Sequence, residues 1–311
     1  MFVSGKEELE TQYTKVRQIG SGSGGTVDLW ASRHTSHKPR FVVQKLITIS
    51  ETPRSINGRT LPQEVRLLLH LNGFNNKHII KVFGEYKIRD PQAHEDDVDF
   101  SPCFSIVNFS FSSALTSPCA SEGLHALLLE ACKTDLENYK HHMSKLKRRV
   151  PEAFLLQVFK ELLEALAFLY MGYGTSHYKQ GTWEPILHED IHEKNILIQD
   201  SEDGKGVTII LADFGLAELA KDVKQGFPTI IYDVVAVGGV VHRLMAPWPG
   251  AELEAKSPYS DAILQPVREA ANIHLYDTEF PEALLQYFLD RPGLTEPYND
   301  DVLAGFKVGR E

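Results

Sequence analysis

The sequence predicts an α+β protein whose first part is rich in β-strands and whose second part is mainly helical. Three observations indicate this. Short β-type runs recur through the first 132 residues, whereas the longest apolar segments with helical spacing, 151–171 and 230–248, come later. Between those two segments, apolar β-type runs at 196–198 and 208–211 flank a polar turn, which is typical of a hairpin.

Composition and charge exclude several classes of protein. The 311 residues are 42% hydrophobic and 24% charged, which is ordinary for a globular protein, and the net charge of −10 argues against general binding to nucleic acid or anionic membranes. Cys103, Cys119 and Cys132 are irregularly spaced and favour a reducing compartment over disulfides or zinc. Residues 1–12 lack an apolar signal core, so we expect an intracellular protein, cytoplasmic or nuclear. Charged residues within 230–248 favour a buried helix over a membrane span.

A glycine-rich stretch joins the first two expected strands, 13–20 and 27–31. It reads Gly20-Ser21-Gly22-Ser23-Gly24-Gly25-Thr26-Val27. Glycines without a Cβ let backbone N–H groups approach phosphate oxygens. A hairpin turn without any ligand would give the same composition. A dinucleotide-binding loop would be followed by a helix, and here a β-type run follows instead.

A lysine lies inside the third expected strand, 41–47, which is otherwise largely apolar. In the following helical segment, 61–71, Glu64 lies on the same side as an apolar stripe. Because an acid on an inward face needs a cation, we expect Glu64 to contact Lys45. The alternatives are a lysine snorkelling from an edge strand and a solvated glutamate.

Two more strands, 79–86 and 125–132, complete the first part, and the Asp-, Ser- and Pro-rich residues 89–123 between them are expected to be an insertion without an assigned role. A helix should begin within residues 133–136, with Thr134 or Asp135 near its N-cap.

A basic cluster, residues 145–149, follows that helix. It is consistent with a nuclear signal, a contact for an acidic substrate, or a solvated helix end. Beyond Met245 we expect loops and two or three helices, including residues 257–268 and 281–289.

Polar residues surround the central hairpin. The segment 188–195, His-Glu-Asp-Ile-His-Glu-Lys-Asn, precedes its first strand, and Asp213-Phe214-Gly215 follows its second. Because a hairpin returns the chain to the same side, Asp190, Asn195 and Asp213 should lie at one edge. Two carboxylates and a carboxamide offer the oxygen ligands that Mg²⁺ prefers, and a spare carboxylate with Mg²⁺ suits phosphoryl transfer.

The order of these motifs resembles that of eukaryotic Ser/Thr protein kinases: a glycine-rich hairpin, a strand lysine, a helix glutamate, His-x-Asp-x-x-x-x-Asn and Asp-Phe-Gly. The resemblance covers about residues 13–290. It implies a two-lobed fold, with a small lobe at 13–132 that contains the 89–123 insertion, a large lobe at 133–311, and the whole of 13–311 as one kinase domain that binds ATP in its cleft.

The resemblance also implies roles for individual residues. Asp190 would accept the proton of the attacking hydroxyl, Asn195 and Asp213 would hold Mg²⁺, and Lys45, paired with Glu64, would hold the α- and β-phosphates. The residues that it places around ATP are Gly20, Ser21, Gly22, Ser23, Gly24, Gly25, Val27, Val43, Lys45, Glu130, Cys132, Asp135 and Leu197. Helix capping competes with ribose binding as the role of Asp135.

Departures from the family pattern leave the acceptor open. His192 is a candidate catalytic residue at a position where protein kinases commonly have lysine, and it resembles the loops of aminoglycoside and choline kinases. The family's arginine before the catalytic aspartate is Glu189, so we expect no activation by loop phosphorylation. The segment 215–231 is short and lacks Ala-Pro-Glu. The acceptor is therefore a protein or a small-molecule hydroxyl, with a nucleotide-binding pseudokinase as a further alternative.

Overall fold

The computed structural model describes the parts of the chain that carry its regular structure: residues 3, 5–22, 25–34, 39–48, 54–56, 59–88, 124–177, 182–220, 230–247, 249–250, 257–271, 290, 303 and 306–308. The chain forms two compact units. The first contains Met1–His70 and Lys81–Ala131 together with Glu311, and the second contains Leu71–Ile80 and Cys132–Arg310. The expected insertion at 89–123 and the expected helix at 281–289 lie outside the described residues.

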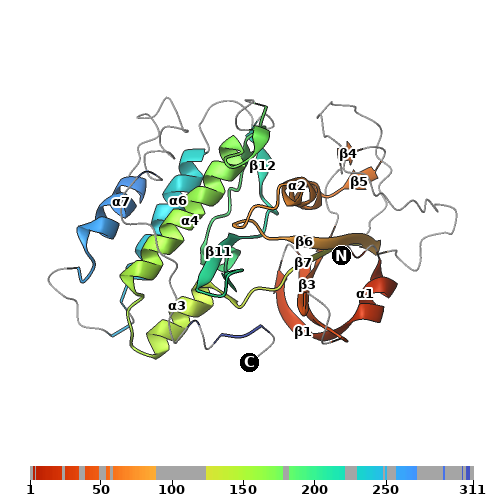
Figure 1. Cartoon of the computed structure of the whole chain (residues 1–311), viewed down its shortest axis with the longest axis horizontal. Coiled ribbons are helices and arrows are strands. Elements are labelled where there is room, and N and C mark those ends of the chain that lie inside the picture. Colours follow the sequence, from red (N-terminus) through yellow and green to blue (C-terminus); the bar gives the residue numbers. More distant parts are fainter. Residues whose placement is uncertain are drawn as a thin grey trace. The chain divides into compact units, whose positions relative to one another are not determined.

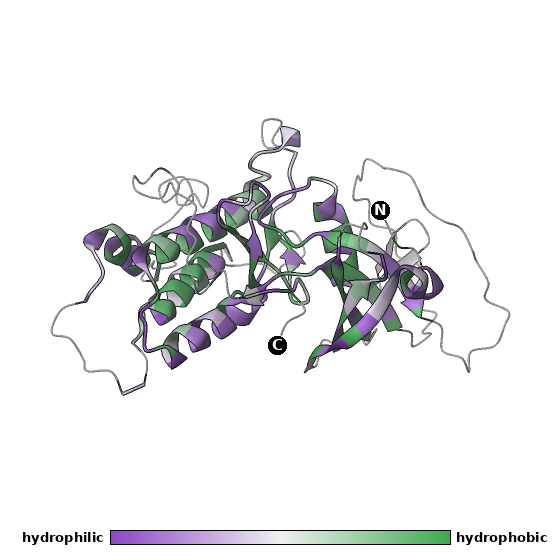
Figure 2. Cartoon of the chain, turned by 60° about the horizontal axis from the view of Figure 1, so that its bottom comes forward, coloured by the Kyte–Doolittle hydropathy of each residue, from purple (hydrophilic) through white to green (hydrophobic). Residues whose placement is uncertain are grey.

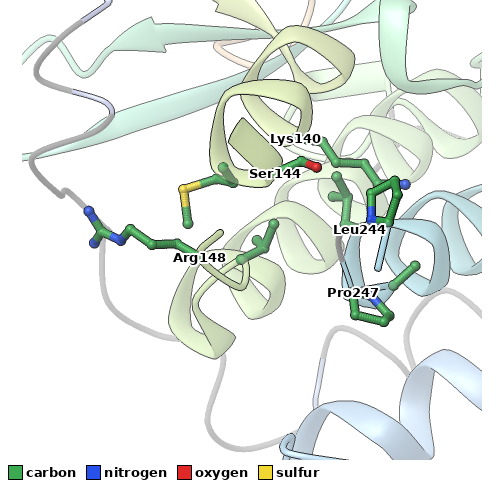
Figure 3. Close-up of a pocket in the computed structure, with 9 residues that line it drawn as sticks. Lys140, Ser144, Arg148, Leu244 and Pro247 are labelled. Carbon is green, nitrogen blue, oxygen red and sulfur yellow. The ribbon is translucent and has the colours of Figure 1, made fainter. Parts of the chain in front are cut away.

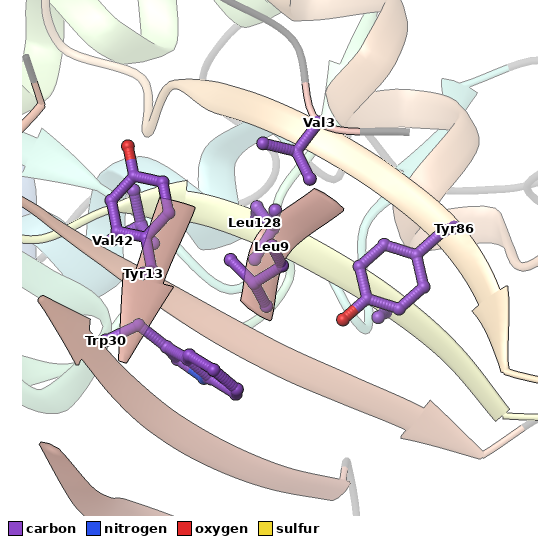
Figure 4. Packing of buried hydrophobic residues seen from close by; sticks show 8 residues of the cluster. Val3, Leu9, Tyr13, Trp30, Val42, Tyr86 and Leu128 are labelled. Atoms are coloured by element: carbon purple, nitrogen blue, oxygen red, sulfur yellow. The ribbon is translucent and has the colours of Figure 1, made fainter. Parts of the chain in front are cut away.

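An antiparallel five-stranded sheet, in the order β1-β2-β3-β7-β6, forms the first unit. Its strands are β1 Tyr13–Gly22, β2 Gly25–Ser32, β3 Phe41–Thr48, β6 Val82–Ile88 and β7 Leu124–Glu130. A cluster of buried hydrophobic side chains packs on it, with Leu9 from the short helix α1 (Lys6–Gln12) at its centre (Figure 4). Within this cluster, Trp30 Nε1 donates to Gln44 Oε1 at 3.2 Å. Expected strands 13–20, 27–31 and 41–47 are therefore confirmed.

The N-terminal segment adds contacts that the sequence did not predict. Val3 N donates to Phe83 O at 2.9 Å, and Val3 bridges Gly84 in parallel. A Cβ at Gly84 would lie 2.2 Å from Val3 O, so glycine is required for this approach. Helix α1 was likewise not predicted from the sequence.

A small hairpin precedes helix α2. It consists of β4, Arg54–Ile56, and β5, Arg59–Leu61, and α2 spans Gln63–Asn72. The sequence predicted a helix from Leu61, but Leu61 ends β5 instead. Pro62 lies at the junction, where its lack of an N–H is tolerated and its ring disfavours a helical conformation for the residue before it.

The segment 71–80 belongs to the second unit. Ile80 N donates to Leu211 O at 3.1 Å, so the strand predicted from residue 79 begins only at Val82. The buried His78 contacts Ile209 O through Nδ1 and Glu164 Oε2 through Nε2, each at 2.9 Å. This segment is thus fixed to the elements of the second unit.

Among the described residues, four helices and several short strands build the second unit (Figure 1). The helices are α3 Leu136–Lys145, α4 Glu152–Met171, α6 Ile230–Met245 and α7 Asp261–Ala271. The strands are β8 Thr134–Asp135, β9 Ile186–Leu187, β10 Ile196–Asp200, β11 Val207–Leu211 and β12 Glu218–Leu219. Helix α4 packs against α6, α7 and β11. Figure 2 shows hydrophobic residues along the helices that pack together. No helix in the described part of the chain is long and apolar enough to cross a membrane.

Helix α4 is largely buried. The predicted bounds are confirmed: Pro151 is the N-cap and Gly172, at φ 69°, is the C-cap. The face that carries its acids is not simply solvated, because Glu161 Oε2 accepts the Ile209 N–H at 2.7 Å and Glu164 contacts His78. The acids on this face therefore join α4 to its neighbours.

Candidate active site

The predicted central hairpin is present as β10 and β11, which pair in antiparallel register from Ile196–Leu211 to Asp200–Val207. Asn195 ends a short 3₁₀ turn, Glu193–Asn195, directly before β10, and Ala212 N donates to Asn195 O at 2.9 Å directly after β11. The hairpin thus brings Asn195 and the neighbour of Asp213 together at one edge, as its topology predicted.

Asp190 and Asn195 form the centre of this edge. The Nδ2 of Asn195 donates to the Asp190 backbone oxygen at 2.9 Å and to its carboxylate Oδ2 at 3.0 Å. The Asp190 side chain is 34% exposed, and its Oδ1 lies 3.5 Å from His192 Nε2. The arrangement orients the Asp190 carboxylate and leaves it partly exposed to solvent.

A buried histidine connects this loop to the Asp-Phe-Gly segment. His188 Nε2 donates to Ala212 O at 3.1 Å, its Nδ1 accepts the Asp190 N–H at 3.3 Å, and its ring meets the edge of Phe214 at 4.8 Å. Burial lowers the pKa of His188 to about 4. One donating and one accepting nitrogen match the neutral imidazole, which packs against Phe214 and orients the loop.

Asp233 of α6 accepts hydrogen bonds from the backbone of the same loop, a role that sequence reasoning missed. Its Oδ2 accepts the His188 N–H at 2.8 Å and its Oδ1 accepts the Glu189 N–H at 3.0 Å. Burial raises the pKa of Asp233 to about 6. Glu189 adopts φ 61°, an uncommon conformation for a residue with a side chain, and Asp233 stabilises it. The available signal was an acid inside an apolar helix, which requires partners.

The opposed pKa shifts of these two buried groups predict how stability depends on pH. The raised pKa of Asp233 makes the folded protein bind a proton more readily, so its contribution to stability falls as pH rises through the interval from 3.8 to about 6. The lowered pKa of His188 acts in the opposite sense, so its contribution falls as pH drops from 6.5 to about 4. The two contributions should nearly cancel between those limits.

An Asp233→Asn variant removes this cancellation. Its free energy of unfolding should then fall, relative to that of the wild type, by up to about 1.4 kcal/mol for each pH unit as the pH drops from about 6 to 3.8, because the wild type alone gains the Asp233 contribution in this interval. Urea unfolding at several pH values measures this slope. Glu202→Gln, on the exposed hairpin turn, is the control and should keep the wild-type profile. Identical pH profiles for Asp233→Asn and the wild type would contradict the prediction.

Oxygen donors at this edge suit Mg²⁺. Since both hydrogens of Asn195 Nδ2 donate to Asp190, the Oδ1 of Asn195 remains as a ligand atom. Asp213, at φ 61°, contributes a carboxylate whose Oδ1 also accepts the Gly215 N–H at 3.3 Å. One carboxamide and one carboxylate oxygen fit an ion that takes few protein ligands and completes its shell with phosphates and water.

The glycine-rich hairpin lies in the first unit, between β1 and β2. Gly20 pairs with Val27, Ser21 with Thr26 and Gly22 with Gly25, whereas Ser23 and Gly24 lie outside the described residues. Gly25 has φ 119°, and a Cβ there would lie 1.6 Å from Leu46 O. This glycine is therefore required by the neighbouring strand, whatever the hairpin binds.

Lys45 and Glu64 form the predicted contact within the first unit. The Nζ of Lys45 lies 2.7 Å from Glu64 Oε1 and 2.9 Å from Oε2, and the two residues are 7% and 5% exposed. Lys45 pairs with Val27 on one side and Leu127 on the other, so β3 is an inner strand. The alternative of a lysine snorkelling from an edge strand is therefore wrong, and Glu64 is not a solvated residue.

The chain is similar to known proteins over most of its length. A family model described as the protein kinase domain matches residues 13–236, which is more than half of the chain. This chain belongs to the protein kinase family. A protein described as probable serine/threonine-protein kinase samkB, from Dictyostelium discoideum, is 23% identical over 218 residues. That match covers 70% of this chain and 28% of the relative, so the chain spans well under two thirds of the relative's length.

The remaining residues that the kinase resemblance places near adenine lie at these positions. In the first unit, Val43 pairs with Leu129, and Glu130 N donates to Lys81 O at 2.9 Å. In the second unit, Cys132 is half-buried, Leu197 pairs with Asp135, and the Asp135 carboxylate caps α3 by accepting the Asn138 N–H at 2.7 Å. The capping role of Asp135 is present, and the nucleotide contacts of all these kinase residues stay predictions.

Proposed function

We propose that this protein kinase domain is an ATP- and Mg²⁺-dependent phosphotransferase of the Ser/Thr protein kinase type. The observation that carries the proposal is the Asp190 carboxylate, which Asn195 fixes at 3.0 Å while leaving it one third exposed. The bidentate contact of Lys45 with Glu64 supports the same function, because the family uses such a lysine to hold the phosphates of ATP.

Asp190 acts as the general base in this proposal. As the oxygen of the acceptor hydroxyl forms a bond to the γ-phosphorus, the bond to the β–γ bridging oxygen breaks and ADP leaves. The proton of the hydroxyl passes to the Asp190 carboxylate. The donation from Asn195 Nδ2 orients that carboxylate, and the His188–Asp233 contacts keep the loop in position. Positioned bases of this kind contribute about 10²–10⁴-fold to rates.

The oxygen atoms of Asn195 and Asp213 would hold Mg²⁺, which when bound neutralises charge on the phosphates. The glycine-rich hairpin, residues 20–27, would direct backbone N–H groups at the same phosphates. Both the protein substrate and the metal coordination belong to this proposal.

A small-molecule kinase is the second candidate function. It is favoured by His192, whose Nε2 lies 3.5 Å from Asp190 Oδ1 and whose Nδ1 accepts the Lys194 N–H at 3.3 Å. This histidine replaces the lysine that is common in protein kinases, and a histidine is cationic only when protonated. The acceptor would then be a metabolite hydroxyl.

Transfer of label from γ-labelled ATP tests both candidates. Purified wild type and Asp190→Ala are incubated with Mg²⁺ and either generic protein substrates or a metabolite pool. Asp190→Ala should reduce transfer by about 10²–10⁴-fold. Asp203→Ala, on the exposed turn of the β10–β11 hairpin, is the matched control and should retain activity.

Each outcome of this assay selects one function. Asp190-dependent label in the protein fraction supports a protein kinase, and label confined to metabolites supports the second candidate. Nucleotide binding without any transfer would identify a pseudokinase and refute the proposal.

A further inference from the structure

Helix α6 contacts the loop that carries Asp190 at two points. In its first turn, the Asp233 carboxylate accepts two backbone N–H groups from the start of the loop. In its last turn, Arg243 donates two hydrogen bonds to the carboxylate of Glu193, from Nε to Oε1 at 2.6 Å and from Nη2 to Oε2 at 3.1 Å. The loop is therefore held on both sides of Asp190.

The two contacts lie far enough apart to fix the direction of the loop as well as its position. Asp233 and Arg243 are ten residues apart in α6, which corresponds to about 15 Å along the helix axis. A single contact would leave the loop free to rotate about it, whereas two separated contacts restrain that rotation. Because Asp190 lies between the loop residues that are held, its carboxylate shares this restraint.

Glu193 begins the short 3₁₀ turn that ends at Asn195. Within this turn, Asn195 N donates to His192 O at 3.0 Å. The Nδ2 of Asn195 in turn donates to the Asp190 carboxylate at 3.0 Å. A displacement of Glu193 would therefore pass through one short turn to the side chain that orients Asp190.

Packing between neighbouring helices does not fully account for the position of this turn. A pocket of about 200 Å³ is lined by Lys140 of α3 and by Leu244 of α6, the residue that follows Arg243 (Figure 3). Van der Waals contact is incomplete where side chains border a pocket. The contact of Arg243 with Glu193 thus joins the loop to α6 beside a region that is not closely packed.

The Glu193 carboxylate faces cations from two helices. Its side chain is 16% exposed, and burial alone would raise its pKa. The hydrogen bonds and charge of Arg243, with a smaller contribution from Lys140, outweigh burial and lower the pKa. Gly239, one turn before Arg243, leaves room for the guanidinium group, because a Cβ there would lie 3.2 Å from Arg243 Nη1. The contact is bidentate, which fixes the relative orientation of the two side chains.

The simpler explanation for Arg243 is that it stabilises the end of α6. A cation in the last turn of a helix interacts favourably with the helix dipole, and partly exposed ion pairs usually add little stability. Arg243 is 49% exposed. Neither effect requires two hydrogen bonds to one carboxylate of the loop, and a lysine would serve the dipole equally well.

We propose that Arg243 is a positioning residue for phosphotransfer, which acts through Glu193 to hold the turn that orients Asp190. The effect on rate rests on the proposed function. The restraint on the loop does not, and it can be measured without any phosphotransfer.

Steady-state kinetics test the effect on rate. Arg243→Gln should lower kcat by about 10- to 100-fold, because small displacements of a catalytic group have effects of this size. The KM for ATP should stay within about threefold of the wild-type value, since Lys45 and the glycine-rich hairpin lie on other elements. Arg243→Lys keeps the charge but not the bidentate contact, so kcat should still fall by about fivefold or more. His242→Gln, at an exposed position in the same turn, is the control and should behave as the wild type.

A double variant tests whether both side chains act through one contact. Glu193→Gln alone should lower kcat about as much as Arg243→Gln, and Glu193→Gln/Arg243→Gln should be no slower than either single variant. Independent roles would instead give losses that multiply, which would overturn the proposal. Thermal unfolding by circular dichroism should show nearly unchanged midpoints for these variants, because the pair is partly exposed.

Hydrogen exchange followed by mass spectrometry tests the restraint without using activity. In Arg243→Gln, backbone amides of residues 188–196 should exchange about tenfold faster, while those of α4 should exchange as in the wild type. Unchanged loop exchange refutes the proposal, and so does faster exchange with an unchanged kcat. Wild-type kinetics of Arg243→Lys would show that charge at the helix end is sufficient and would also refute it. If the wild type transfers no phosphate, the proposed function fails, and faster loop exchange would still support the restraint by Arg243.

Discussion

Replacing Lys45 by methionine should abolish phosphotransfer and lower the free energy of unfolding by about 3–5 kcal/mol. Methionine preserves most of the side-chain volume but leaves the Glu64 carboxylate, 5% exposed, without the cation that lies 2.7 Å from it. The stability loss comes from an uncompensated buried charge. The activity loss comes from the missing contact with the ATP phosphates, which belongs to the proposed function. Chemical unfolding and the labelled-ATP assay measure the two effects.

A double variant separates these two causes. In Lys45→Met/Glu64→Gln both buried charges are absent, so most of the lost stability should return, because neutral replacement of a whole ion pair is often tolerated. Phosphotransfer should remain absent, since no cation is left at position 45. Lys87→Met, on an exposed position of β6, is the control and should change neither quantity. Recovery of phosphotransfer in the double variant would mean that Lys45 contributes to folding and is not needed for phosphotransfer.

Gly172→Ala should lower the free energy of unfolding by about 3 kcal/mol. Gly172 ends α4 at φ 69°, where a Cβ is unfavourable, and that Cβ would lie 2.6 Å from Cδ2 of Trp183. The indole cannot move away freely, because its Nε1 donates to Leu169 O at 2.8 Å. Its ring also packs near Phe168, at a centroid distance of 5.2 Å. The free-energy costs of backbone strain and of displacing the indole ring should therefore add.

Gly204 provides a control with matched backbone geometry. It has the same φ, 69°, but a Cβ there would meet nothing within 4 Å. Gly204→Ala should cost only about 1–2 kcal/mol of strain. The difference between the two variants, measured by urea unfolding, isolates the contact with Trp183. Equal losses of unfolding free energy at both positions would show that the Trp183 indole can move aside without a free-energy cost.

The sequence allowed the main elements and the local contacts of the candidate site residues to be predicted, because these depend on short-range patterns. Alternation and helical spacing indicated the strands and α4, and hairpin topology placed Asn195 beside the end of β11. An inward glutamate also predicted the contact of Glu64 with Lys45. Such predictions need only the period of a strand or helix and the requirement that buried charges be paired.

Long-range contacts could not be predicted in this way. The docking of Val3 beside Gly84 joins residues far apart in sequence, and no local pattern specifies it. The support of His188 and Glu189 by Asp233 crosses 45 and 44 residues. Residues 79–81 have strand-like composition, yet Ile80 bonds to Leu211 instead of extending β6. In each case a partner from a distant segment, and not local propensity, determines the conformation.

The assignment of residues 71–80 to the second unit has a consequence for synthesis on the ribosome. Ile80 and the buried His78 have partners at residues 164, 209 and 211, which emerge more than eighty residues later. Until those residues appear, His78 and Ile80 lack these hydrogen-bond partners. In a nascent chain that stops at residue 132, the segment between α2 and β6 should therefore lack its native hydrogen bonds at His78 and Ile80, and these should form only after β11 has been translated.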